Sequence, residues 1–249
     1  MTKPRRRSPF ALGWEAARAN LIPALFIQAL MLALLVAYYV NPLAHTALEA
    51  LAVYRARCGF AFVLIAAVLA GAIVPEIFLI AFFQRGRPGK QNLRNLLFTI
   101  PIWAFDGSLV DLLYRSEAAW LGDVVTLPVV AAKVFVDQFG YNVFFAAPFG
   151  VLTYEWKNDG FSWGSLGRSF TWPHFRDKII PTLVATWAVW IPMTAIIYSL
   201  PLALQFPLFS LALVFWVLLL TYMTNTFARK NSRAEDAPDV VSSAIPEIH

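Results

Sequence analysis

The chain has 249 residues, of which 59% are hydrophobic and only 14% are charged, and its mean hydropathy is +0.61. This composition lies outside the usual range for a soluble globular domain and predicts a membrane protein. The formal net charge is +5, but the basic residues flank apolar runs, so nucleic-acid binding is not expected. The single cysteine, Cys58, cannot form an intrachain disulfide, and without a cluster of metal ligands we expect no metal or cofactor.

Apolar runs long enough to cross a bilayer recur along the chain, beginning with residues 21–40. The basic segment 1–20 resembles the start of a signal peptide, but a signal peptide has a shorter apolar core and a small-residue cleavage site. We therefore expect a basic cytoplasmic N-terminus followed by a retained first span. The predicted spans are 21–40, 60–83, 93–114, 124–154, 179–200 and 206–227, within a membrane domain at 21–228.

The second and third spans carry acidic residues within apolar sequence. Pro75 should kink the second span because proline removes a backbone hydrogen bond, and Glu76 lies at that kink. Glu76 is either an inward-facing polar site or a protonated or locally hydrogen-bonded glutamate. In the third span, Asp106 is expected near mid-depth and Asp111 within reach of the membrane interface.

The fourth span holds Lys133, Asp137 and Gln138 inside its apolar run. An unpaired charge at membrane depth costs about 2.5–3.5 kcal/mol, so such residues face a bundle interior or a wet cavity. Lys133 and Asp137 are one helical turn apart, where each can neutralise the other. Two interpretations stay open: a structural ion pair in a helix bundle, and a charged pair that lines a solute path.

The segment between the fourth and fifth spans is polar and aromatic. Trp163, Leu166 and Phe170 recur at helical spacing, which predicts a short interfacial helix over 161–171, with an ordinary loop as the alternative. After the last span, the polar tail 229–249 is predicted to be disordered.

The distribution of basic residues predicts the topology. With six spans and the N-terminus inside, only Arg55, Arg57 and Arg115 lie outside, Lys133 lies in the membrane, and all other basic residues lie inside. The expected fold class is all-α: a polytopic helical membrane protein with a single bundle of about six transmembrane helices and both termini inside.

Several residues from the third span onward match a family pattern. Gly107 and Tyr114 occupy the first and last positions of Gly-Pro-x-x-His-x-Trp-Tyr, although the residues between them differ. Lys133 with the following Asp-Gln pair matches Lys-x-x-x-Asp-Gln. The further matches are Trp163, Leu166, Phe170, Pro201 and Trp216. Together they resemble the Mpv-seventeen and twenty-two-kilodalton peroxisomal membrane protein family, with the span 21–40 as an addition.

The resemblance implies a small-solute conduit, because members of that family are thought to form channels or to affect solute balance. We therefore hypothesise a channel-like conduit for small solutes or ions. The alternative is a non-conducting scaffold or assembly partner, in which the same polar residues only pair helices. An enzyme is not expected, since HExxH, GxSxG and Gly-rich phosphate-loop motifs are missing from the sequence. The predicted pore or intramembrane polar network is Glu76, Asp106, Asp111, Lys133, Asp137 and Gln138.

The predicted partners are the lipid bilayer and small solutes or ions, with a homo-oligomer left open. The first 20 residues contain Ser8 as their only serine, which is unlike a serine-rich organelle transit peptide. We therefore predict a multi-pass protein of a plasma or inner membrane rather than of an organelle.

Overall fold

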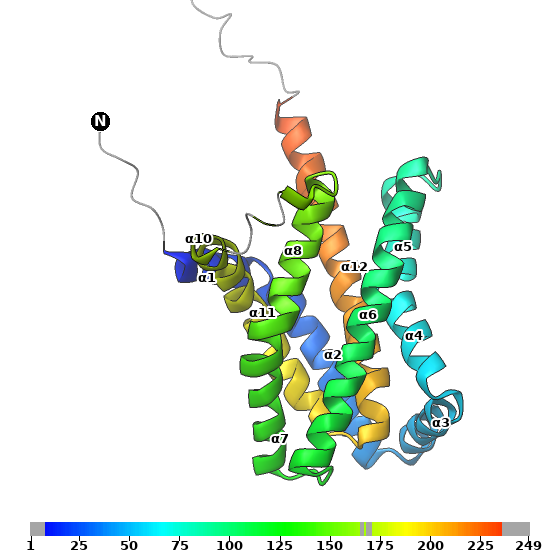
Figure 1. Cartoon of the computed structure of the whole chain (residues 1–249). Helices are drawn as coiled ribbons and strands as arrows, with labels where there is room; N and C mark the ends of the chain where they lie inside the picture. Colours follow the sequence, from blue (N-terminus) through cyan, green and yellow to red (C-terminus); the bar gives the residue numbers. More distant parts are fainter. Residues whose placement is uncertain (1–7, 165–166, 168–170, 236–249) are drawn as a thin grey trace, which may run out of the picture.

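A computed structural model of the chain describes residues 8–164, 167 and 171–235. The described residues are almost entirely helical and contain no strand, so the predicted all-α class is confirmed (Figure 1). The elements are α1 (Pro9–Ala19), α2 (Leu21–Val40), α3 (Pro42–Cys58), α4 (Phe60–Val68), η1 (Leu69–Ile73), α5 (Val74–Phe83), α6 (Lys90–Leu121), α7 (Leu127–Phe135), η2 (Val136–Ala146), α8 (Ala147–Asn158), α10 (Trp172–His174), η3 (Phe175–Ile179), α11 (Ile180–Tyr198) and α12 (Leu202–Glu235).

Three π-helical segments, η1, η2 and η3, join neighbouring α-helices into longer continuous helices. Each of them ends two residues before a proline: Pro75, Pro148 and Pro181. Proline has no backbone N–H, and its ring crowds the carbonyl of the preceding turn. A wider, π-helical turn relieves this crowding. A π-helical segment precedes Pro75, where the kink was expected, and the same arrangement occurs before Pro148 and Pro181.

Polar caps and glycines set several helix boundaries. Asn41 precedes Pro42 at the start of α3, and its Oδ1 accepts hydrogen bonds from the backbone N–H groups of Leu43 and Ala44, at 2.9 and 3.1 Å. Gly59 follows α3 with a φ of 55°, and Gly122 follows α6 with a φ of 88°. Glycine adopts these left-handed conformations easily, and such a conformation ends an α-helix. The two glycines therefore mark the ends of α3 and α6.

Four helices of the described chain are long and apolar enough to cross a membrane: Leu21–Val40, Phe60–Phe83, Lys90–Leu121 and Trp172–Tyr198. The continuous helix that contains η2 is not among them, and the apolar helix Leu202–Leu218 is shorter. The structure is therefore that of a helical protein with several apolar helices suited to a membrane. Six spans and the side of each terminus remain predictions.

The first half of α12 forms the centre of the bundle. It contacts α2, α3, α4, α5, α6 and α11. Its buried side chains include Leu204, Phe206, Leu208 and Ala212, and they belong to one large core cluster. Many large apolar side chains on the other helices are exposed, as expected of helices that face lipid.

Two glycines allow close contact between the second and third long helices. A Cβ atom on Gly107 of α6 would overlap the side chain of Ala67 on α4. A Cβ atom on Gly71 of η1 would overlap the indole ring of Trp103. Small residues therefore bring these helices together, as they often do in membrane bundles.

The connections alternate between the two ends of the bundle. In Figure 1, α1, α10 and the upper ends of α5 and α8 lie at one end, whereas α3 and the start of α7 lie at the other. The segment 41–59, between the first two predicted spans, is mostly the helix α3. The basic segment 1–20 likewise contains a helix, α1, which contacts α11 through Gly13.

Two predicted regions are described only in part. Within the expected interfacial helix 161–171, residues 165–166 and 168–170 lie outside the described residues. Helix α12 continues to Glu235, beyond the expected start of the tail at 229, and residues 236–249 again lie outside the description.

Candidate functional site

A cavity of about 410 Å³ lies between α6, the helix formed by η2 and α8, α11 and α12. Its volume is typical of a site for a small organic molecule. Of the six residues predicted to form a polar network, Asp106, Asp137 and Gln138 line this cavity. The structure brings these three together and places the other three elsewhere.

Asp137 occupies a hydrogen-bonded position in the cavity wall. Its Oδ2 accepts from the hydroxyl of Tyr198 at 3.0 Å, and its Oδ1 accepts from Nε2 of Gln138 at 3.1 Å. Oε1 of Gln138 in turn accepts from Nδ2 of Asn142 at 3.2 Å. The indole N–H of Trp187 donates to the Gln138 carbonyl at 3.0 Å. This π-helical stretch is therefore fixed to α11 through both a side chain and its backbone.

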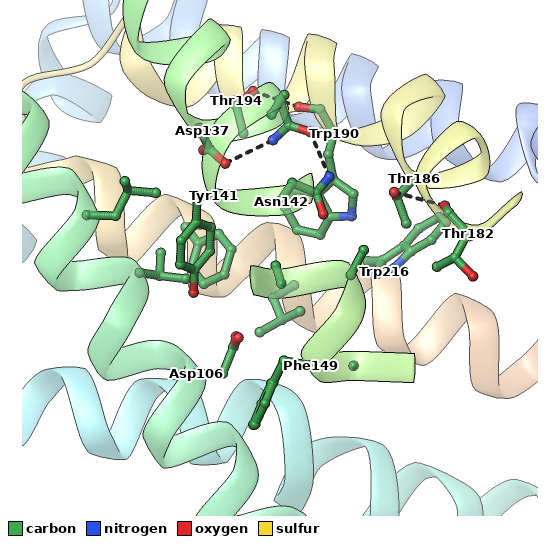
Figure 2. Close-up of a pocket in the computed structure, with 18 of the residues that line it drawn as sticks. Asp106, Asp137, Tyr141, Asn142, Phe149, Thr182, Thr186, Trp190, Thr194 and Trp216 are labelled. Atoms are coloured by element: carbon green, nitrogen blue, oxygen red, sulfur yellow. Dashed lines mark hydrogen bonds between the residues drawn. The ribbon is translucent and has the colours of Figure 1, made fainter. Parts of the chain in front are cut away.

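Asp106 differs from Asp137 because it has no hydrogen-bond or ion-pair partner among the described residues. Tyr141 lies close enough to interact electrostatically with both carboxyl groups. Its buried hydroxyl also lacks a hydrogen-bond partner within the described part of the chain. In Figure 2 the ring of Tyr141 points towards Asp106, with Phe149 on the other side of that carboxyl in this view.

The rest of the wall is aromatic or weakly polar. It includes Thr182, Thr186 and Thr194 of α11, whose hydroxyls donate to carbonyls of the continuous helix formed by η3 and α11. Figure 2 shows two of them, Thr182 and Thr186, joined in this way. The aromatic lining residues are Trp103, Tyr114, Tyr141, Phe149, Tyr154, Trp190, Phe209 and Trp216. The only carboxyl groups of the described lining are those of Asp106 and Asp137. The described lining contains no lysine, arginine or histidine, so no basic side chain faces these acids.

The ion pair predicted between Lys133 and Asp137 does not form. Lys133 is 2% exposed, and its ammonium lies 5.9 Å from the centre of the Tyr198 ring. Its electrostatic interactions are with Glu117 of α6 and with Asp123. The prediction assumed one α-helix through both residues, but the π-helical segment begins at Val136 and changes their spacing around the axis. In addition, Tyr198 of α11 donates to Asp137 and satisfies its carboxylate from a neighbouring helix. Lys133 therefore interacts with Glu117 of α6 instead of with Asp137.

Glu117 is a buried acid that was not among the predicted polar residues, because it lies beyond the predicted end of the third span at residue 114. It is 1% exposed, and its carboxylate lies beside Tyr198 and Lys133. The signal was present in the sequence. Gly107, Val110, Tyr114 and Glu117 recur at intervals of three and four, which places Glu117 on the buried face of α6.

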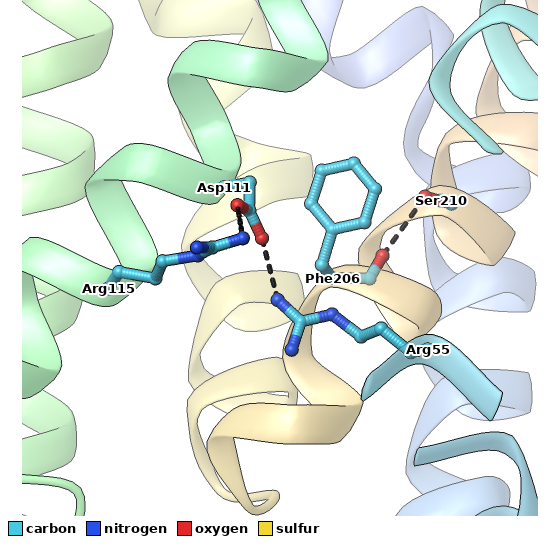
Figure 3. A network of polar contacts seen from close by, with 5 residues as sticks. All are labelled: Arg55, Asp111, Arg115, Phe206 and Ser210. Atoms are coloured by element: carbon cyan, nitrogen blue, oxygen red, sulfur yellow. Dashed lines mark hydrogen bonds and ion pairs between the residues drawn. The ribbon is translucent and has the colours of Figure 1, made fainter. Parts of the chain in front are cut away.

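Asp111 belongs to a three-residue ion cluster rather than to the cavity. It contacts Nη2 of Arg55 on α3 at 2.6 Å and Nη2 of Arg115, one turn along α6, at 2.5 Å (Figure 3). The side chain of Arg55 is 13% exposed and reaches into the bundle, and the predicted outside position of this residue is not tested by the structure. Asp111 is thus a buried link between α3 and α6, and its expected position near the membrane interface stays a prediction.

Glu76 forms a separate pair with Asn92. Nδ2 of Asn92 donates to Oε1 of Glu76 at 2.6 Å, and both residues are buried. Oδ1 of Asn92 accepts from the backbone N–H of Gly89 at the start of α6. Of the two interpretations of Glu76, the structure therefore favours the locally hydrogen-bonded one.

The family-motif positions have different environments. Gly107 lies at the α4–α6 contact, and Tyr114 and Trp216 line the cavity. Pro201 lies in the turn between α11 and α12, and Trp163 is 75% exposed. Leu166 and Phe170 lie outside the described residues.

Comparison of the chain with protein-family models, with curated proteins and with solved structures finds no match. The functional interpretation therefore depends on the cavity, its charge and its position between apolar helices.

Proposed function

We propose that this protein is an integral membrane protein that acts as a conduit for small solutes, with the cavity as the solute site. The observation that carries the proposal is an acidic and aromatic cavity between helices, two of which have the length and composition of membrane spans. Ionisable residues in such helices usually mark a solute pathway or pair with one another. Asp106 has no such partner among the described residues, which favours the pathway for this position.

The likeness of Gly107, Tyr114 and Trp216 to positions of the Mpv-seventeen family supports the same proposal, since two of them line the cavity. We propose no catalytic role. A plasma or inner membrane is the proposed location.

A scaffold is the second candidate function, and the paired polar residues favour it. Arg55 with Asp111 and Asn92 with Glu76 connect helices without reaching the cavity. Buried polar pairs of this kind contribute to helix association in membranes. A non-conducting protein would need these pairs and would have no use for the unpaired Asp106.

Flux through reconstituted vesicles separates the two functions. We expect the purified protein to pass small cations or neutral polar solutes in preference to anions, because the lining carries acids and no described base. Asp106→Asn should reduce cation flux or its preference. Glu76→Gln is the matched control, because glutamine can still accept from Asn92 and the residue lies outside the cavity. A well-folded protein that passes neither cations nor neutral polar solutes would favour the scaffold.

A further inference from the structure

We propose that the cavity binds an organic cation, an amine or quaternary ammonium compound with an apolar body, between Asp106 and the aromatic side chains of the wall. This inference names the solute class of the site on which the proposed function rests. It begins with charge: the described lining has two carboxyl groups and no basic side chain.

The buried basic residues of the bundle interact with acids outside this cavity and do not neutralise its carboxyl groups. Lys133 is buried beside Tyr198 and interacts with Glu117 and Asp123. Arg55 and Arg115 are held by Asp111. Asp137 accepts two hydrogen bonds from neutral groups, whereas Asp106 has no partner in the described structure. A ligand that brings a positive charge would therefore supply what Asp106 lacks.

The aromatic wall gives the ligand its second property. A cation over the face of an aromatic ring is attracted by the ring's quadrupole, and the attraction grows when water is excluded. Tyr141 lies near Asp106. Trp190 and Phe209 also line the cavity, and the centroids of their rings are 5.8 Å apart. A carboxylate together with several rings favours an alkylammonium head over a hydrated ion.

Other occupants fit less well. Ca²⁺ and Mg²⁺ take six or more oxygen ligands, but much of this wall is aromatic or aliphatic. An organic anion would meet two acids without a described base. A neutral lipid chain would fill the apolar part and leave the carboxyl of Asp106 unpaired. The volume of about 410 Å³ accommodates a small aromatic or alkyl ammonium compound.

Calorimetric titration of the purified chain in phosphatidylcholine nanodiscs tests the inference. The probes are benzyltrimethylammonium, benzyl alcohol as the neutral control and benzenesulfonate as the anionic control. We expect the cation to bind about tenfold or more tightly than the alcohol, and the anion to show no binding. No binding of the cation, or equal affinity for the neutral or anionic probe, would overturn the inference.

Two matched pairs of variants locate the site. Asp106→Asn should weaken cation binding about tenfold, whereas Asp159→Asn, at an exposed residue outside the cavity, should leave it unchanged. Tyr141→Leu should weaken binding more than Tyr141→Phe does, because the second variant keeps the aromatic ring. Unchanged affinity in well-folded Asp106→Asn would place the cation elsewhere and contradict the proposal. If that variant does not fold, the relative affinities of the wild-type protein for the three probes still test the proposal.

Binding and transport can fail separately. A protein that binds the cation selectively but passes no solute would support the organic-cation site and contradict the conduit. A protein that passes neutral solutes but does not prefer the ammonium probe would contradict this inference and leave the conduit intact.

Discussion

Glu76 and Asp106 both interrupt apolar helices, but their neighbours give them different roles. Glu76 accepts a hydrogen bond from Asn92 outside the cavity, whereas Asp106 faces the cavity without a partner in the described residues. An acid that is satisfied by its own fold contributes to stability, and one that is not satisfied is available to a ligand. Residue type and depth alone do not separate these cases, because the difference lies in the neighbouring helix.

Lys133 and Glu117 provide a test at the scale of single residues. Because Lys133 interacts electrostatically with Glu117 and does not pair with Asp137, we expect Lys133→Met and Glu117→Gln to be coupled in a double-mutant cycle. The coupling should lie within about 0.5–3 kcal/mol, the range for residues that interact. The measurement is the free energy of unfolding in mixed micelles, determined for the wild type, both single variants and the double variant.

The matched control is the cycle of Lys133→Met with Asp137→Asn, which should give a smaller coupling because Tyr198 and Gln138 satisfy Asp137. A larger coupling to Asp137 than to Glu117 would restore the ion pair predicted from the sequence.

At the scale of elements, prolines and small residues shape the helices around the cavity. The segment η2 contains Asp137, Gln138 and Asn142, and it ends two residues before Pro148. The backbone carbonyl of Gln138 accepts from Trp187, so the wider turn brings no unsatisfied carbonyl at that position. In a bilayer such satisfaction is required, since lipid offers no hydrogen bonds. The polar wall thus depends on α11 as well as on its own helix.

The contact between α4 and α6 yields an element-scale prediction. Gly107→Ala should destabilise the protein by about 1–3 kcal/mol, because the added Cβ overlaps Ala67 and forces the two helices apart. Gly140→Ala is the control, since its Cβ would meet nothing within 4 Å. The free energy of unfolding in mixed micelles measures both.

Compensation distinguishes this contact from a local effect on the α6 backbone. The pair Ala67→Gly with Gly107→Ala should lose less stability than the sum of the two single changes, because the methyl group is moved across the interface rather than added. Additive losses would show that the helices do not meet closely at these positions.

For the whole molecule, local composition was enough to predict helices with the length and hydropathy of membrane spans. The apolar runs 21–40 and 60–83 correspond to helices with membrane-span character, because transfer to lipid depends on local hydropathy. Tertiary partners were not predictable in this way. Tyr198 is 61 residues from Asp137, and Arg55 is 56 residues from Asp111. Nothing in the local pattern of either acid indicates such a distant partner.

The same limit explains the errors in the site. The polar network was inferred as one path because its members share membrane depth, but the structure separates Glu76, Asp111 and Lys133 from the cavity. Three partner residues on two helices account for the separation: Asn92 and Glu117 of α6, and Arg55 of α3. Three-dimensional packing therefore decides which buried charges remain available to a ligand.

Topology is the prediction that belongs to the whole molecule. The basic connector 84–89 and the end of α8 lie at one end of the bundle, and α3 and the connector 122–126 lie at the other (Figure 1). Because lysine and arginine are retained on the cytoplasmic side, the first end should be inside. With Cys58→Ser as background, cysteines at Arg87 and Asp159 should react with an impermeant maleimide from the inside, and cysteines at Ala47 and Asp123 from the outside. Labelling of Arg87→Cys and Asp123→Cys from the same side of sealed vesicles would contradict the six-span arrangement.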